Sequence, residues 1–261
     1  MKFALLFCLV TGIGLASVHH VYRAGAAGAA GAFDVTEQVD KTVTLSPGAN
    51  VRVSGINGWV KIETGDGDRA EVHVAIRASD REAMDRRPLV VESTPTSLAV
   101  FTEQDREGRG RGWNRGWVHH EVTLRLPRQV NLKVSSVNGA VTAGPITGSA
   151  TVSSVNGRVI LEQASTVTSL TSINGRTSVS MARLSEGGLN ISSVNGGVDV
   201  SLPPTTNAQV EVRSVNGGID TDLPITVLGE MRRGQLVGTL GQGGPKINIV
   251  SVNGGVNLRR N

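Results

Sequence analysis

The chain has 261 residues, of which 33 are glycine and only 3% are aromatic, and its formal net charge is +4. The surplus of glycine follows no Gly-X-Y triplet, which excludes collagen, and so small a net charge does not by itself indicate a nucleic-acid partner. A core with so few aromatic residues must be thin and built from Val, Ile, Leu, Ala and Thr, which suits stacked strands better than a large globular core.

Residues 1–32 have the pattern of a targeting segment. Lys2 precedes an apolar run from Phe3 to Val18, which is short for a membrane-spanning helix and typical of a secretory signal peptide. Ala30-Gly31-Ala32 matches the small-x-small cleavage pattern, and a second such site precedes it. The only cysteine, Cys8, lies in the apolar run, so a processed chain would lack disulfides. The sequence therefore predicts export to the periplasm or cell surface. An uncleaved signal anchor is the alternative and the only predicted membrane contact.

Alternating apolar residues predict strands through residues 33–128, an N-terminal region of a domain that continues to residue 261. Strands are expected on both sides of the turn Gly65–Asp68, and a further hairpin is expected from Leu89 to Phe101. Helical signals are nearly absent, and a short helix is expected only within Ser79–Arg87, just before a proline.

Residues 129–261 repeat one phrase, in which Ser and then Val or Ile precede Asn-Gly. Six copies contain the asparagines Asn138, Asn156, Asn174, Asn195, Asn216 and Asn253, and a degenerate copy, Gly55-Ile56-Asn57-Gly58, lies upstream, outside the regular array. The six asparagines are 18, 18, 21, 21 and 37 residues apart, and the last interval is close to two periods with one motif lost. A nearly fixed period is typical of repeat proteins, in which each unit buries its apolar face against its neighbours.

Two architectures are consistent with this unit. Asn-Gly favours a type I′ hairpin turn, so an antiparallel meander sandwich is possible. A hairpin turn does not explain why Ser and then Val or Ile precede Asn-Gly in every full copy. In a parallel β-solenoid, equivalent residues stack about 4.8 Å apart. Buried asparagine amides would then form a structural ladder, Ser would fit an inward corner, and Val155, Ile173 and Val194 would pack in a dry interior. We therefore predict an all-β, right-handed parallel β-solenoid, with the meander sandwich as the alternative.

The run Val122–Pro127, continued through Asn131–Val134 into Ser136-Val137-Asn138-Gly139, resembles the bacterial DUF4097 family of adhesin-like β-strand repeat proteins. The late stretch from Arg233 to Asn253 is similar to the usual ending of that family, and the resemblance covers roughly residues 40–261. It implies an exported, β-helix-like envelope protein and brings no reaction, cofactor or known ligand. Some relatives belong to envelope-stress operons, which implies an alternative role as an envelope-stress-associated binding protein.

One segment, Arg106–Trp117, has an unusual composition for a loop between strands. Its arginines and tryptophans are Arg106, Arg109, Arg111, Trp113, Arg115 and Trp117. Interleaved Arg and Trp occur in single-strand nucleic-acid binders, but an exported protein seldom meets nucleic acid, so no such partner is predicted. A solvated loop is the simpler interpretation. Contact with anionic envelope polymers or lipid headgroups is the functional one, and a glycan or protein partner also remains open.

No catalytic, metal or cofactor site is predicted. His119 and His120 are adjacent on a strand, so their side chains face opposite sides and do not share a metal. Enzymes that cleave polysaccharides need clustered carboxylates, or an Arg/Lys–carboxylate constellation, on one face of consecutive coils. Here Asp199 and Asp220, each four residues after its asparagine, are expected to stack as one acidic pair. We predict a non-catalytic structural or adhesion-type module, with a polysaccharide-acting enzyme as the less favoured alternative.

Overall fold

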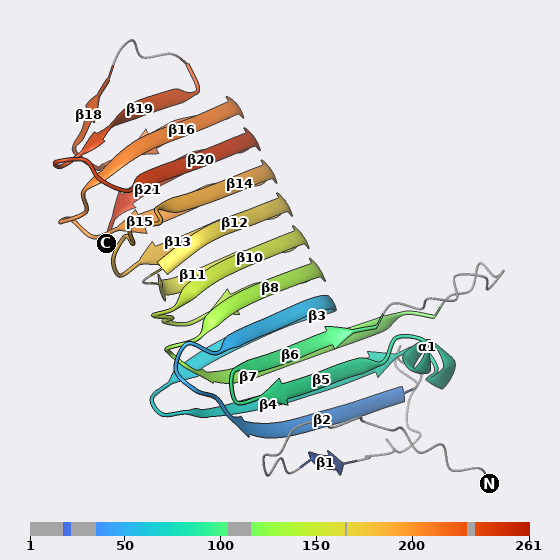
Figure 1. The fold of residues 1–261 in the computed structure, drawn as a ribbon. Coiled ribbons are helices and arrows are strands. Elements are labelled where there is room, and N and C mark those ends of the chain that lie inside the picture. Colours follow the sequence, from blue (N-terminus) through green and yellow to red (C-terminus); the bar gives the residue numbers. More distant parts are fainter. Residues whose placement is uncertain (1–17, 22–34, 104–115, 165, 229–232) are drawn as a thin grey trace, which may run out of the picture.

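The structure, a computed structural model, describes residues 18–21, 35–103, 116–164, 166–228 and 233–261. Strands make up 68% of the chain and helix 2%, which confirms the all-β prediction. Most of the strands belong to one large, mostly parallel sheet that is not closed (Figure 1). Within the described ranges no helix is long and apolar enough to cross a membrane.

Seven strands and one short helix are found among the described residues of the N-terminal region. They are β1 (Val18–Val21), β2 (Val35–Thr44), β3 (Asn50–Gly65), β4 (Arg69–Ala78), α1 (Arg81–Asp85), β5 (Leu89–Thr94), β6 (Ser97–Thr102) and β7 (Val118–Pro127). Helix α1 lies within the predicted segment Ser79–Arg87. The carboxylate of Asp80 caps it by accepting a hydrogen bond from the Ala83 backbone N–H at 2.6 Å.

The described part of the repeat region contains fourteen strands, from Asn131 to Arg260. They are β8 (Asn131–Asn138), β9 (Val141–Ala143), β10 (Ser149–Asn156), β11 (Val159–Ala164), β12 (Thr166–Asn174), β13 (Thr177–Met181), β14 (Leu189–Asn195), β15 (Val198–Leu202), β16 (Ala208–Asn216), β17 (Ile219–Thr221), β18 (Ile225–Val227), β19 (Gln235–Leu240), β20 (Lys246–Asn253) and β21 (Val256–Arg260).

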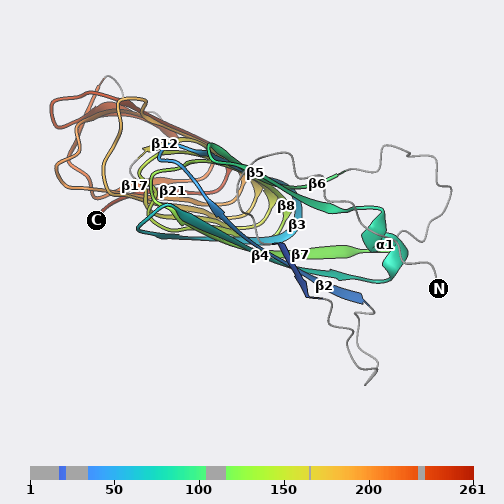
Figure 2. The ribbon, with the colours of Figure 1, turned by 60° about the horizontal axis from the view of Figure 1, so that its bottom comes forward.

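Each repeat contributes one strand to each of two parallel rows, which lie along the stack (Figure 1). The first row holds the strands that end in the repeated phrase, in the spatial order β8, β10, β12, β14, β20, β16. The second row holds the strands that follow it, in the order β9, β11, β13, β15, β21, β17. Strand β3 is long enough to join both rows, pairing with β8 and then with β9. The turned view in Figure 2 shows the successive coils nested one behind another.

The repeated phrase sets the register of the stack. Ser154 pairs with Ser136 on one side and Ser172 on the other, and Asn156 pairs with Asn138 and Asn174. A slip of one residue would exchange the buried and exposed faces of the whole strand, so burial of one face fixes this alignment.

Antiparallel pairs are found at the two ends of the described stack. At one end β1, β2, β4 and β7 pair in that order and β5 pairs with β6, and at the other end β19 pairs with β16 and β18. The antiparallel meander is therefore wrong for the repeats, where Asn-Gly turns the chain into the second row. The predicted hairpin from Leu89 to Phe101 is confirmed as β5 and β6. Strands β3 and β4, which flank the Gly65–Asp68 turn, are instead separated by β7.

The last repeat is inserted inside the stack. Strand β20 lies between β14 and β16, and β21 lies between β15 and β17. The interval of 37 residues between Asn216 and Asn253 is therefore not two coils with a lost motif. Its residues include β18 and β19, which cover the outer edge of β16 before the chain returns to fill the gap.

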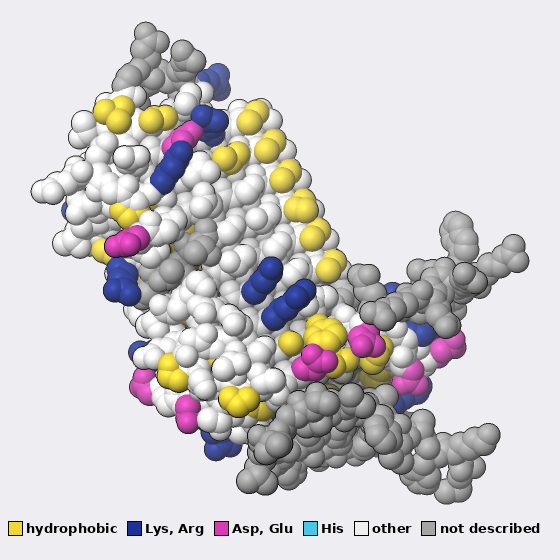
Figure 3. All heavy atoms as spheres, viewed as in Figure 1, with side chains coloured by type: hydrophobic (Ala, Val, Ile, Leu, Met, Phe, Trp, Pro, Cys, Tyr) yellow, Lys and Arg dark blue, Asp and Glu magenta, His cyan; other side chains and the backbone are white. Residues whose placement is uncertain are grey.

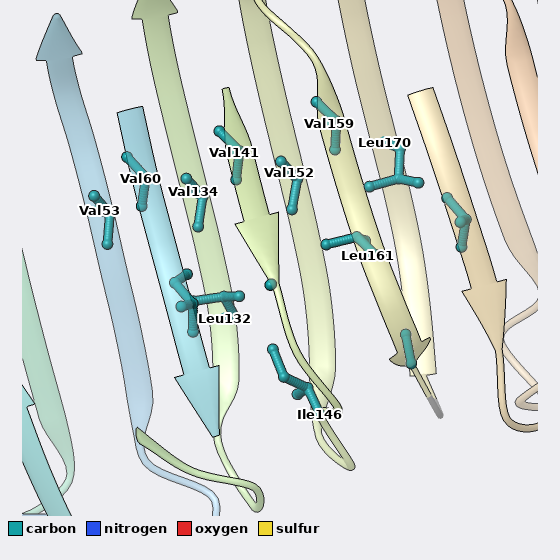
Figure 4. Close-up of a cluster of buried hydrophobic side chains, with 14 of the residues drawn as sticks. Val53, Val60, Leu132, Val134, Val141, Ile146, Val152, Val159, Leu161 and Leu170 are labelled. Atoms are coloured by element: carbon teal, nitrogen blue, oxygen red, sulfur yellow. The ribbon is translucent and has the colours of Figure 1, made fainter. Parts of the chain in front are cut away.

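The core is a continuous aliphatic cluster between the two rows, extending from Val43 to Leu258. Figure 4 shows Val134 and Val152 of the first row facing the same interior as Val141 and Val159 of the second. All four side chains are at most 1% exposed. Burial of one residue in two on each strand explains the alternating apolar pattern in the sequence.

Candidate functional site: the repeated corner

Serine occupies the inside of the corner in every full copy of the phrase. The six serines, Ser136, Ser154, Ser172, Ser193, Ser214 and Ser251, are at most 5% exposed. The hydroxyls of Ser193 and Ser251 donate to the carbonyl oxygens of Gly196 and Gly254, at 3.1 and 3.0 Å. A small side chain is needed in this narrow space. The Ser172 hydroxyl makes the same contact within its corner, whereas those of Ser136 and Ser214 donate to carbonyl oxygens of a neighbouring coil, and Ser154 Oγ has no hydrogen-bond partner among the described residues. The expected inward position of Ser is thus observed.

Glycine is required because successive corners touch through their backbones. A Cβ atom on Gly157 would lie 1.9 Å from the carbonyl oxygen of Gly139, and one on Gly175 would lie 2.1 Å from that of Gly157. The Gly157 N–H also donates to the carbonyl oxygen of Asn174 at 2.9 Å, which joins neighbouring coils. Any side chain here would force the coils apart.

The asparagines of the phrase are linked by their side chains into one row, the amide ladder. From Asn138 onward, each Nδ2 donates to the Oδ1 of the asparagine one coil nearer the N-terminal region. The donors in spatial order are Asn138, Asn156, Asn174, Asn195, Asn253 and Asn216, and the distances are 2.8 to 2.9 Å. The row begins at Asn57, whose Nδ2 donates to the Val118 carbonyl oxygen at 2.6 Å. Asn57 therefore belongs to the ladder, contrary to its expected place outside the regular array.

The ladder lies on the surface. The six asparagines of the full copies are all exposed, so the expectation of buried amides is wrong. A carboxamide has two N–H donors and two acceptor lone pairs, and the ladder uses one of each along the row. Each inner member therefore has remaining hydrogen-bonding capacity on its solvent side, repeated at every coil.

The Val or Ile of the phrase also faces solvent, against the prediction of a dry interior. Val137, Ile173, Val194 and Val215 are 43%, 40%, 38% and 71% exposed, and Val155 and Val252 are half-buried. These six side chains form a straight apolar row, here called the aliphatic ridge, along the edge of the first row of strands (Figure 3).

The sequence contained a signal for this outward position. Leu132, Val134 and Ser136 alternate along β8 and are all buried, so Val137, out of step with them, must point outward. The apolar character of Val indicates burial. The alternation of buried residues that includes Ser136 instead places the next residue, Val137, on the solvent side.

The outer face of the first row carries no charged side chain on β10, β12 and β14. Its side chains beside the ridge are Thr151, Ser153, Ser169, Thr171, Asn190, Ser192, Asn248 and Val250. Charged residues lie towards the two ends of this face: Arg52 and Lys133 at one end, and Glu211, Arg213 and Lys246 at the other. The ammonium of Lys246 and the guanidinium of Arg213, each 2.7 Å from the Glu211 carboxylate, lower the pKa of Glu211.

The expected acidic pair does not form. Asn257 of the inserted β21 lies between Asp199 and Asp220 in the second row. Its Nδ2 donates to Asp199 Oδ1 at 2.7 Å, while Arg176 and Arg259 bind the carboxylates of Asp199 and Asp220 at 3.0 and 2.7 Å. The insertion thus replaces two stacked carboxylates with an alternation of acid and amide, held by cations.

Most of the Arg-Trp segment lies outside the described residues, including Arg106, Arg109, Arg111, Trp113 and Arg115. Trp117 is described: it immediately precedes β7 and is 39% exposed. Its carbonyl oxygen accepts a hydrogen bond from the Ser79 N–H at 3.0 Å, which places it beside the end of β4.

The adjacent histidines face opposite sides of β7, as expected. His120 is 1% exposed, and neither ring nitrogen has a hydrogen-bond partner among the described residues. Burial lowers the pKa of His120 from 6.5 to about 4, and the charges of His119 and Arg87 act in the same direction. The Asn57 backbone opposes this shift, although its geometry falls short of a hydrogen bond. No group of three or more His, Cys, Asp or Glu suited to a metal occurs in the described parts of the chain.

No protein-family profile and no curated protein matches the sequence. Solved structures with a similar course include a "putative cell adhesion protein" from Clostridium sporogenes, which has 13% identity, covers 86% of this chain and 100% of its own, and has a TM-score of 0.47. A "putative adhesin" from Bacteroides fragilis has 12% identity, covers 86% of this chain and 97% of its own, and has a TM-score of 0.39. Likenesses at this level do not define a family, a ligand or a function for this chain.

Proposed function

We propose that this protein is an exported, non-catalytic module of the cell envelope or cell surface, adhesion-type or structural in function, and folded as a right-handed parallel β-solenoid. The observation that carries the proposal is the amide ladder. It offers the same donor and acceptor groups at each coil, about 4.8 Å apart, along the outside of a rigid stack. Such a row suits a long ligand that repeats along its own length.

An uncharged glycan of the envelope or of a neighbouring surface is the ligand class that we favour. Sugar hydroxyls both donate and accept, as carboxamides do, and the first-row strands β10, β12 and β14, which lead into the ladder, contain no charged residue. A single exposed hydrogen bond contributes little, since water competes for both partners. Several equal contacts on one rigid edge can act together, which raises the overall affinity without any strong single site.

The second row supports a non-catalytic role. Hydrolysis of a glycan by paired carboxylates needs two acids that converge on one bond. Asp199 and Asp220 are instead separated by Asn257 and each is bound by an arginine. The polar side chains at this position of the second row bind one another across neighbouring strands.

Retention on isolated cell-wall polysaccharide tests the ladder. The double variant Asn174→Ala/Asn195→Ala removes central ladder amides, and Ser178→Ala/Ser201→Ala changes the second row of the same coils as the matched control. We expect the first variant to lose most retention and the control to keep it, with both folded by circular dichroism. Equal retention of the two variants and the parent would refute the ladder as the contact. Recovery of the protein in the cytosolic fraction would refute export.

The Arg-Trp segment is a second candidate contact, for anionic envelope polymers or headgroups. Deleting Gly108 to Gly116 should reduce retention on isolated envelopes at low salt and have less effect at high salt, because salt screens exposed charges. A deletion variant retained as well as the parent at every salt concentration would leave the segment without a binding role.

A further inference from the structure

The aliphatic ridge has no role in the core, yet all six full copies keep Val or Ile there. Thr has the same branched shape and suits a strand as well, but it occurs at none of these six positions. Single exposed apolar residues are common on protein surfaces, whereas a continuous row of them indicates an interaction surface. Six such side chains lie in line here, beside a neutral face (Figure 3).

The spacing of the ridge points to its occupant. Neighbouring ridge side chains are one coil apart, about 4.8 Å, which is the spacing of hydrogen-bonded strands. A second copy of this chain has the same spacing by construction. Branched side chains of one ridge can therefore pack against those of the other along its whole length, as in the dry interfaces between paired sheets.

The charge pattern is compatible with contact between identical faces. Packing a face against its own copy brings like charges together unless the contacting part is neutral. The coils of β10, β12 and β14 present only Ser, Thr, Asn, Val and Ile on this face. The charged side chains Arg52, Lys133, Glu211, Arg213 and Lys246 lie beyond them.

The available area is adequate for a reversible dimer. Six strands about 4.8 Å apart, each with three outward residues about 6.8 Å apart, give a face on the order of 600 Å². Side-chain relief brings this near the roughly 800 Å² per partner of a standard interface. A face of this size and mixed polarity suits a dimer that dissociates on dilution.

We propose that two copies pair through the outer faces of their first rows, with the ridges antiparallel about a two-fold axis between Ile173 and Val194. This orientation places Lys133 of one copy near Glu211 of the other, whose carboxylate Arg213 and Lys246 bind within its own chain, so the two Lys133 side chains lie at opposite ends of the dimer. A parallel arrangement would set Lys133 against Lys133. The inference does not rest on the proposed function.

Sedimentation equilibrium over a range of protein concentrations tests the dimer. The sample is the protein as processed by, and purified from, the cells that express it. The ridge variant Ile173→Asp/Val194→Asp places charges at the proposed axis. The control Ser178→Asp/Ser201→Asp adds the same charges to the second row. We expect the parent and the control to dimerise alike and the ridge variant to raise the dissociation constant at least tenfold, with its circular dichroism unchanged.

Cysteine pairing tests the orientation. In a Cys8→Ser background, Val155 should face Val252 of the other copy. A mixture of the single variants Val155→Cys and Val252→Cys should therefore form mixed disulfides faster than either forms with itself. Faster self-pairing of each variant would overturn the antiparallel arrangement.

Two results would overturn the dimer itself. One is a parent protein that stays monomeric at every concentration tested. The other is a ridge variant that dimerises like the parent. If the parent is monomeric and the Ile173→Asp/Val194→Asp variant binds cell-wall polysaccharide less well than the parent does, the ridge contacts the polysaccharide and not a second copy.

Discussion

The N-terminal and repeat regions hold neighbouring strands together by different side-chain chemistry. In the N-terminal region, opposite charges face each other across strands: Arg125 lies 3.0 Å from Glu63 and Arg77 lies 3.4 Å from Glu121. In the repeat region, ion pairs such as Arg176 with Asp199 lie outside the corners, and at the corners identical groups face each other, as in the row of asparagine amides and the column of buried serines.

The difference follows from the pairing pattern. Parallel, in-register repeats place each residue beside its own equivalents, so a charged residue would stack on a like charge. A carboxamide both donates and accepts, and therefore bonds to a copy of itself. Strands that are not copies of one another can place Glu opposite Arg. Regular stacking therefore selects neutral, self-complementary side chains, which accounts for the uncharged middle of the first row.

The largest expected effect concerns the inserted repeat. Deleting residues 246–261 removes β20 and β21, which lie between β14–β15 and β16–β17. Because each coil of a stack contacts only its neighbours, β16 to β19 should lose protection from hydrogen exchange while β2 to β7 keep theirs. Loss of protection confined to the last few residues would contradict the internal position of this repeat.

A pair of substitutions within β12 should separate the core from the ridge. Leu170 is 1% exposed and Ile173 is 40% exposed. Leu170→Ala should cost about 2–5 kcal/mol through lost burial and a cavity. Ile173→Ala should cost less than about 1 kcal/mol, as surface changes do. Equal losses in denaturant unfolding would show that the ridge is buried in the monomer, contrary to the structure.

Acid should weaken the N-terminal region first, through His120. Its pKa is 6.5 when unfolded and about 4 when buried, so the unfolded state binds the proton more readily between these values. Stability from this group is complete above the unfolded pKa and is lost as pH falls, by about 2 kcal/mol between pH 7 and pH 5. His120→Gln should remove this slope in unfolding titrations. His119→Gln is the control and should keep it. A slope unchanged by His120→Gln would disprove the assignment.

The smallest effect compares the two kinds of cross-strand bonding directly. Asn174→Ala removes two ladder hydrogen bonds and should cost about 1 kcal/mol at any salt concentration. Arg125→Ala removes ion pairs to Glu63 and Glu71, at 3.0 and 3.6 Å, on an exposed face. Its effect should be smaller and should fade as salt rises. Melting temperatures of both variants at low and high salt measure this contrast.

Much of the stack was predictable because the phrase repeats. Its period indicated coils, its serine indicated a small inward corner, its glycine a tight turn and its asparagine a self-bonding row. Each of these features depends on the phrase itself or on one copy lying beside any other copy. They can therefore be predicted without knowing which copies are neighbours. The exposure of the amides and of Val155, Ile173 and Val194 was not predicted. Apolar or self-bonding side chains indicate burial, whereas the alternation of buried residues through Ser136 and its equivalents places the Val or Ile on the outside.

Only the tertiary structure decided the order of the coils. The copies are nearly identical, so β20 can pair with β14, with β16 or with both, and the sequence offers no preference. The choice depends on β18 and β19, which occupy the outer edge of β16 and leave the gap beside β14 for the last repeat. That choice also placed Asn257 between Asp199 and Asp220. Neighbours across a sheet are set by long-range packing, which the local pattern of a repeated sequence does not encode.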